Sequence, residues 1–113
     1  MPATDAVRLR HIVDAARQAV AFVRGRSRAD LDTDSMLSLA LVRLLEVIGE
    51  AARAISPAVR EAHPETAWSK MAGMRDRLIH GYFDVNLDIV WETVTQDLPM
   101  LISQIEPIVR SLE

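Results

Sequence analysis

The most regular apolar repeat in the chain lies in its last quarter. Apolar residues there alternate in steps of four and three: Leu87, Trp91, Val94, Leu98, Leu101, Ile105, Ile108 and Leu112. This spacing predicts a long helix with one buried seam, of the kind that packs in an antiparallel bundle. Pro99 and Pro107 lie inside the repeat, and each removes a backbone hydrogen-bond donor. We therefore predict a kink or break near one of them.

The first half of the chain predicts two more long helices. The first helix is expected to end near Gly25, with Thr4 or Asp5 as its N-cap. Its apolar stripe consists of Leu9, Ile12, Val13, Ala16, Ala19, Val20 and Val23. The second begins around Asp34 and is apolar on almost every face from Met36 to Ile55. Such a helix must be covered on most sides, so it lies at the centre of a bundle or packs against a second subunit. We favour a homodimer.

Shorter helices are predicted between these long ones. Ser56 and Pro57 are typical of a helix start, which predicts a short helix through Arg60. A further helix is expected from Ala67 to about His80, with Thr66 as its cap at the start and Gly81 at the end. Residues 1–113 show no repeat and no pattern of β-strands, so we predict a single all-α domain, a bundle of four main helices plus a short one.

Composition indicates where the protein is located in the cell, but it does not indicate an activity. The chain has no cysteine and no apolar run long enough to cross a bilayer, and its first residues lack the apolar stretch of a signal peptide. We expect a cytoplasmic protein without a membrane partner. Its net charge is −3, but arginines dominate residues 1–28 and acidic groups dominate residues 84–113. These runs are either solvated helix faces or, less commonly, a surface that binds phosphate.

The candidate chemistry lies in residues 75–83, which read RDRLIHGYF. The chain has no cysteine and no familiar metal, phosphate-loop or dinucleotide motif, so no metal or cofactor is expected. On a helix, Arg75 and His80 would lie about 140° apart around the axis, whereas Asp76 and His80 would share a face. The carboxylate could then orient the imidazole, and the guanidinium suits phosphate.

These groups suffice in principle to cleave RNA without a metal. The 2′-hydroxyl can attack the adjacent phosphorus if His80 manages protons and Arg75 stabilises charge on the phosphate oxygens. In a dimer, two facing copies of the helix could place Arg75 of one chain near His80 of the other. A structural alternative remains open, because a basic residue at the end of a helix also interacts favourably with the last carbonyls and the helix dipole.

A narrow polar stripe crosses the second long helix. Arg43, Glu46, Glu50 and Arg53 lie on one face of it, where Arg43–Glu46 and Glu50–Arg53 pairs could form along the helix surface. Alternatively the stripe borders the candidate cleft, where Glu50 could hydrogen-bond Arg75 and fix its direction. Both interpretations stay open at this point.

Two segments resemble a known family. MRDRLIHGYFDVNLDIVWETVTQDLP and IGEAARAIS resemble the corresponding regions of HepT, small all-α toxins of the HEPN superfamily. The family motif is an arginine, a polar residue, three further residues, a histidine, any residue and a tyrosine. Arg75, Asp76, His80 and Tyr82 fill it here without departure.

The resemblance implies a homodimeric endoribonuclease toxin. Arg75 and His80 would be catalytic, with Asp76 supporting them. It also implies that Tyr82 accepts AMP from ATP, transferred by the partner antitoxin MntA, a minimal nucleotidyltransferase; the added anion beside the cleft would exclude RNA. Two alternatives remain: a dimeric binding module that presents Tyr82 to such a partner without cutting RNA, and a purely structural bundle. Nothing in the sequence names the RNA.

Overall fold

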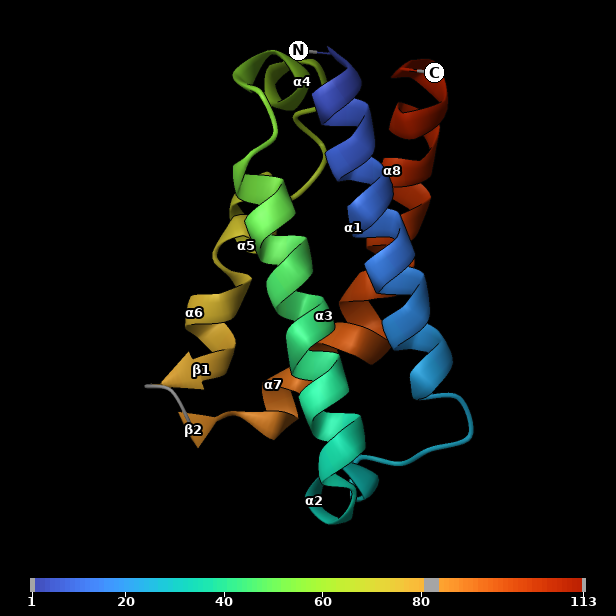
Figure 1. Cartoon of the computed structure of the whole chain (residues 1–113), viewed down its shortest axis with the longest axis vertical. Helices are drawn as coiled ribbons and strands as arrows, with labels where there is room; N and C mark the ends of the chain where they lie inside the picture. Colours follow the sequence, from blue (N-terminus) through green and yellow to red (C-terminus); the bar gives the residue numbers. More distant parts are fainter. Residues whose placement is uncertain (1, 81–83, 113) are drawn as a thin grey trace.

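Three long helices define the shape of the molecule. The computed structural model describes residues 2–80 and 84–112. Within them α1 (Pro2–Phe22), α3 (Ser35–Arg53) and α8 (Leu98–Leu112) run alongside one another, and the two termini lie at the same end (Figure 1). The predicted all-α bundle is confirmed.

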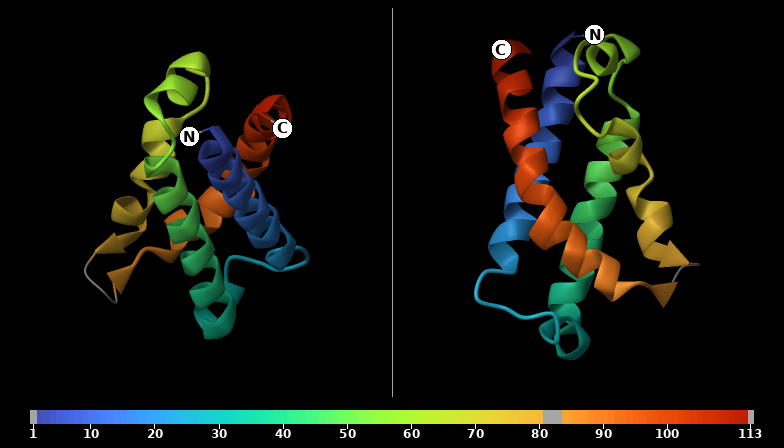
Figure 2. Two further views of the ribbon diagram at one scale, coloured as in Figure 1. Left: turned by 45° about the horizontal axis from the view of Figure 1, so that its top comes forward. Right: turned by 180° about the vertical axis from the view of Figure 1, so that it is seen from behind.

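The apolar stripes of the long helices form one core. α1 packs against α3 on one side and α8 on the other, as the different views show (Figure 2). Leu9 on α1, Leu45 on α3 and Ile105 on α8 are completely buried in the same cluster. The predicted C-terminal seam is confirmed, since its middle residues from Val94 to Ile108 are buried. None of the helices in the described ranges is long and apolar enough to cross a membrane.

Short elements connect the long helices. They are α2 (Asp30–Thr33), α4 (Pro57–Ala62), α5 (Trp68–Ala72), α6 (Met74–Leu78), β1 (Ile79–His80), β2 (Asp84–Val85), α7 (Leu87–Glu92) and the π-helix η1 (Thr93–Asp97). Two predicted starts are confirmed by their caps. The Asp34 carboxylate accepts a hydrogen bond from Leu37 N at 3.1 Å, and Ser56 Oγ accepts one from Val59 N at 3.4 Å. Both caps satisfy backbone donors that the first helical turn leaves unpaired.

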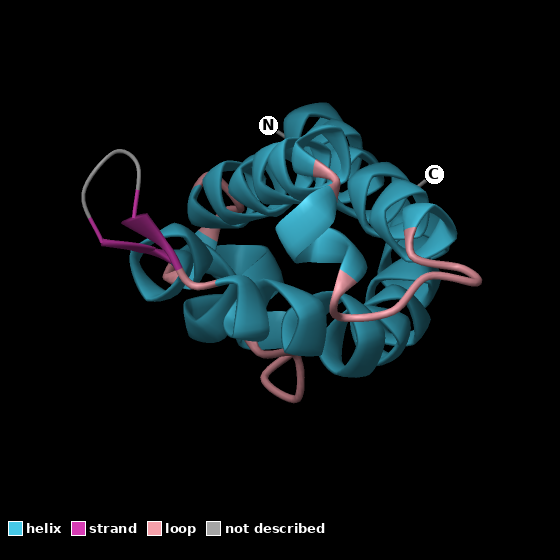
Figure 3. Cartoon of the chain, turned by 90° about the horizontal axis from the view of Figure 1, so that it is seen from below, coloured by secondary structure: helices cyan, strands magenta, loops and turns pink. Residues whose placement is uncertain are grey.

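The predicted helix from Ala67 to His80 is confirmed only in part, since it is interrupted once and stops two residues early. It is divided at Gly73 into α5 and α6, and α6 ends at Leu78. Ile79 is extended, with φ −116° and ψ 118°, and β1 pairs antiparallel with β2 at the edge of the bundle (Figure 3). Ile79 and Val85 are opposite each other in this pairing and pack against the core, which favours the extended conformation over another helical turn. Gly81, the predicted cap, lies outside the described residues.

The predicted kink or break takes the form of a π-helical segment just before Pro99, and the chain stays helical through it. The backbone is π-helical from Thr93 to Asp97, and Leu98 N donates to Thr93 O, five residues back. Pro99 has no N–H, so the helix loses one regular hydrogen bond at this place, and a wider turn accommodates the loss. Pro107 lies within α8.

Charges that are far apart in the sequence pair across the fold. Arg17 on α1 pairs with Glu106 on α8, and Arg28 Nε donates to Asp88 Oδ1 at 2.7 Å. Each of these arginines therefore pairs with an acidic residue of the C-terminal segment.

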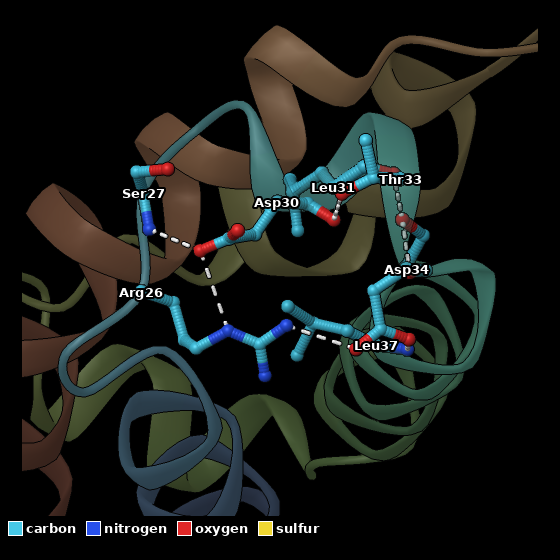
Figure 4. A network of polar contacts seen from close by, with 8 residues as sticks. Arg26, Ser27, Asp30, Leu31, Thr33, Asp34 and Leu37 are labelled. Atoms are coloured by element: carbon cyan, nitrogen blue, oxygen red, sulfur yellow. Dashed lines mark hydrogen bonds and ion pairs between the residues drawn. The ribbon is translucent and has the colours of Figure 1, made fainter.

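The connection between α1 and α3 is fixed by a second polar network. Arg26 lies between Asp30 and Asp34, with Nε–Oδ2 at 3.3 Å to the first and a terminal nitrogen to Oδ2 at 2.9 Å to the second (Figure 4). Ser27 N also donates to Asp30, at 2.7 Å. The bond from Arg26, followed by that from Leu37 N, holds the pKa of Asp34 below its ordinary value. The turn out of α1 uses Gly25 at φ +70°, a conformation that suits glycine.

Asp5 is not the N-cap that the sequence suggested. α1 begins at Pro2, and the Asp5 side chain is buried against the start of α4, where it accepts hydrogen bonds from Ser56 N at 3.0 Å and Ser56 Oγ at 2.7 Å. Burial alone would raise the pKa of the Asp5 carboxyl. The two bonds from Ser56 outweigh burial and lower the pKa below its ordinary value of 3.8.

We predict that Asp5→Asn lowers the free energy of unfolding at neutral pH by about 1–3 kcal/mol, because the hydrogen bonds from Ser56 lose a charged acceptor. A carboxyl with a lowered pKa stabilises the fold fully above pH 3.8, and this contribution is lost as the pH falls through the folded-state value. The difference between wild type and variant should therefore shrink in acid. Urea unfolding at pH 7 and near pH 3 measures it, with exposed Asp14→Asn as control. A difference that does not change with pH would contradict the assignment.

Candidate functional site

The site is built on α6, a short helix held by two buried residues. Met74 and Leu78, four residues apart, point into the core, and Leu78 is completely buried. The side chains between them are consequently exposed, including Arg75 and Asp76. The sequence thus places both polar motif residues at the surface of a helix that is anchored from beneath.

The hairpin that follows α6 carries the histidine. His80 lies in β1, with its backbone opposite Asp84 of β2. Asn86 fixes the base of this hairpin, since its N–H donates to Leu78 O at 2.8 Å and its side chain accepts from Ile89 N at 3.1 Å to cap α7. Tyr82, the candidate modification site, lies outside the described residues.

Arg75 is paired from α3, but not by the residue that we predicted. Arg75 Nε lies 3.7 Å from Glu46 Oε2, and the two side chains are 50% and 23% exposed. Glu50, the predicted partner, is exposed and forms no hydrogen bond or ion pair with another described residue. One turn of helix separates the two carboxylates, and spacing along α3 could not reveal which of them faces α6.

Asp76 is held by α3 as well. Its Oδ2 atom lies 3.6 Å from a terminal nitrogen of Arg53, and Arg53 Nε donates to Ala72 O at 3.0 Å. The predicted sharing of a helix face by Asp76 and His80 is wrong, because the helix ends before His80. The predicted pairs within the stripe, Arg43–Glu46 and Glu50–Arg53, are also absent from the part of the chain that the structure describes.

Gly49 allows α3 to approach α5 and α6 closely. Gly49 is buried, and a Cβ atom added to it would lie 3.2 Å from Met71 O, 3.8 Å from Ala72 O and 3.9 Å from Met74 Cβ. A side chain at this position would press on the backbone of α5, so the close packing of the two helices explains why a glycine suits this position. The two ion pairs flank this contact, since Glu46 and Arg53 lie on either side of Gly49 in α3.

An open groove of about 630 Å³ borders Arg75. Its lining comes from α2, α3, α6, the hairpin and the start of α7: Leu31, Asp32, Ser35, Ser38, Leu39, Val42, Arg43, Glu46, Arg75, Ile79, Val85 and Leu87. Its charged lining consists of two arginines, Arg43 and Arg75, and two acidic residues, Asp32 and Glu46, while most of its surface is apolar. A smaller hollow of about 300 Å³ lies between α5 and α8, and its lining includes none of the motif residues.

The site also contains features that sequence reasoning missed. The sequence pattern pairs Glu46 with Arg43 rather than with Arg75. It also gives no role to Asn86, although an asparagine directly before an apolar helix is a typical N-cap. Gly49 was noticed only as part of a resemblance. The described residues contain no cluster of acidic, histidine or cysteine side chains suited to a metal ion.

Comparison with known proteins places the chain in a family. Residues 12–108 match the family of HepT-like ribonucleases. The chain belongs to this family. A protein of Caldanaerobacter subterraneus subsp. tengcongensis, named as a candidate RNase, is 41% identical over 102 residues, which cover 90% of this chain and 91% of that protein.

Two further relatives widen the comparison for this HepT-like protein. A candidate ribonuclease HepT of Thermococcus cleftensis is 39% identical over 98 residues, covering 87% of this chain and 89% of the relative. In Methanocaldococcus jannaschii, a protein named as both a gamma-glutamylcyclotransferase and a candidate RNase is 33% identical over 105 residues. The match covers 93% of this chain and 47% of that relative. No solved structure matches the chain at comparable significance.

We predict that Gly49→Val lowers the free energy of unfolding by about 1–3 kcal/mol, because the added atoms press on the backbone of α5. Ala21→Val is the control, since it creates the same residue at an exposed position of α1, where the lower helix propensity costs less than about 1 kcal/mol. Urea unfolding of both variants measures the difference. An equal cost at the two positions would show that α3 and α5 are not in such close contact.

Proposed function

We propose that this HepT-like protein is an endoribonuclease that cuts RNA without a metal ion, with Arg75 and His80 as its catalytic residues. The observation that carries the proposal is the position of Arg75. It is half exposed at the edge of an open groove, paired through Nε with Glu46, and it precedes by a few residues the strand that carries His80. An arginine with one side held by the protein can still bind a phosphate with its terminal nitrogens.

The proposed reaction uses the RNA's own nucleophile. The 2′-hydroxyl oxygen attacks the adjacent phosphorus as it loses its proton, the bond from phosphorus to the 5′ oxygen breaks, and that oxygen gains a proton. The products are a 2′,3′-cyclic phosphate and a free 5′-hydroxyl. His80 moves the protons, and Arg75 stabilises the negative charge that develops on the phosphate oxygens.

The exposed face of α3 supports a homodimer as the active form. Met36 and Leu39 are 81% and 70% exposed, and they lie on the same face of α3 as Arg43 and Glu46. Apolar side chains this exposed are typical of a surface that a partner covers. A second copy across this face would bring two grooves together, with an Arg75 from each chain.

We further propose that the protein is the toxin of a toxin–antitoxin pair in the cytoplasm. Its antitoxin would be a nucleotidyltransferase of the MntA type. The Tyr82 hydroxyl oxygen attacks the α-phosphorus of ATP, and pyrophosphate leaves, so that AMP becomes attached two residues from His80. The added phosphate repels the RNA backbone by charge and occupies space beside the site.

The first test is cleavage of a mixed RNA pool in EDTA. Wild-type protein should cut, and His80→Ala and Arg75→Ala should each cut about 10²–10³ times more slowly. Arg77→Ala is the matched control, because Arg77 is exposed on the same short helix and has no part in the proposal. Equal cleavage by wild type and His80→Ala would refute the assignment. A folded, unmodified wild type that leaves RNA intact would instead favour a binding module without nuclease activity.

The second test addresses the modification. After incubation with ATP and a nucleotidyltransferase of the MntA type, intact mass should rise by one or more AMP units, and RNA cleavage should stop. Tyr82→Phe should gain no mass and keep its nuclease activity under the same conditions. Transfer of AMP to the Tyr82→Phe variant would place the modification elsewhere.

A further inference from the structure

We propose that Glu46 is the positioning residue for Arg75, a role that rests on the proposed nuclease function and extends it. Glu46 does not touch the reacting atoms in this account. It acts through Arg75, whose guanidinium it holds toward the groove that both residues line.

The contact is made at the atom that best suits this role. Glu46 Oε2 faces Arg75 Nε at 3.7 Å rather than a terminal nitrogen. The two terminal nitrogens of a guanidinium form a fork that matches two oxygens of a phosphate. A carboxylate beside Nε restrains the plane of the group and leaves this fork turned toward a ligand.

Glu46 lies in a closely packed part of α3. Glu46 is only 23% exposed, and it is preceded in α3 by Leu45, which is completely buried. Gly49 brings α3 close to α5, and Arg53 contacts Ala72 O at the end of α5 and Asp76 on α6. Two ion pairs of opposite direction, Glu46 to Arg75 and Asp76 to Arg53, thus join α3 to neighbouring residues of α6.

Positioning and charge predict opposite effects on binding and turnover. Glu46 adds a negative charge beside a surface that must bind phosphate, so its removal should leave RNA affinity unchanged or raise it. Turnover should fall all the same, because Arg75 is no longer held in the geometry that the transition state needs. A residue that only stabilised the fold would not produce this combination.

The first measurement concerns the contact itself and needs no enzymatic activity. In protein labelled with nitrogen-15, the Nε–Hε signal of Arg75 is identified by its loss in Arg75→Lys. Glu46→Gln should shift this signal, whereas Glu61→Gln, an exposed carboxylate on α4, should leave it in place. Glu50→Gln tests the neighbouring carboxylate on α3.

The second measurement separates turnover from binding. We expect Glu46→Gln to lower kcat about 10- to 100-fold while KM does not rise. Its Kd for an uncleavable 2′-O-methyl RNA should equal that of wild type or be lower. In an Arg75→Ala background the same change should cause no further loss, because a residue that acts through Arg75 cannot act without it. Melting temperatures of all variants verify that they fold.

Each outcome decides the inference. An unmoved Arg75 signal in Glu46→Gln overturns it, as does unchanged kcat, or a loss of activity in Glu50→Gln with none in Glu46→Gln. An additive loss in the Arg75→Ala background shows that Glu46 acts independently and also overturns it. If the signal moves but wild-type protein cuts no RNA, the nuclease proposal fails, while the orientation of Arg75 by Glu46 is established.

Discussion

The close packing of α3 against α5 and α6 is the constraint on which the site depends. Gly49 gives the helices their short separation, and the burial of Met74 and Leu78 holds α6 in place. A helix as short as α6 is not stable by itself, since helix formation in isolation requires many more residues. The candidate catalytic arginine therefore owes its position to tertiary packing, and any change that separates α3 from α5 also displaces Arg75.

The ion pairs between α3 and α6 orient side chains and contribute little stability. The pairs that flank Gly49 involve side chains that are largely solvent-exposed, apart from Glu46, and exposed pairs contribute little to the free energy of folding. Their value is geometric. A core of apolar side chains fixes where α6 lies, and charged partners on α3 determine where its polar side chains point.

Periodicity in the sequence was enough to predict the long helices and their buried faces, because each stripe reflects a single amphipathic element. It failed where neighbouring segments compete. The residues around Ile79 do not indicate that pairing with Val85 ends the helix. The sequence of α3 likewise does not distinguish Glu46 from Glu50 as the partner of Arg75. Asp5 is a similar case, since its carboxylate binds Ser56 at the start of α4, fifty-one residues further along the chain. These contacts depend on how elements meet in space, which a pattern along one segment does not contain.

The two chain termini leave the bundle at the end occupied by α4, whereas the hairpin with His80 projects from its side toward the other end (Figure 1). A domain joined to either terminus would thus begin away from Arg75 and the groove. The two-part relative of Methanocaldococcus jannaschii carries a matching segment as about half of its length. In a protein built this way, the joined domain would lie at the end of the bundle away from the candidate site.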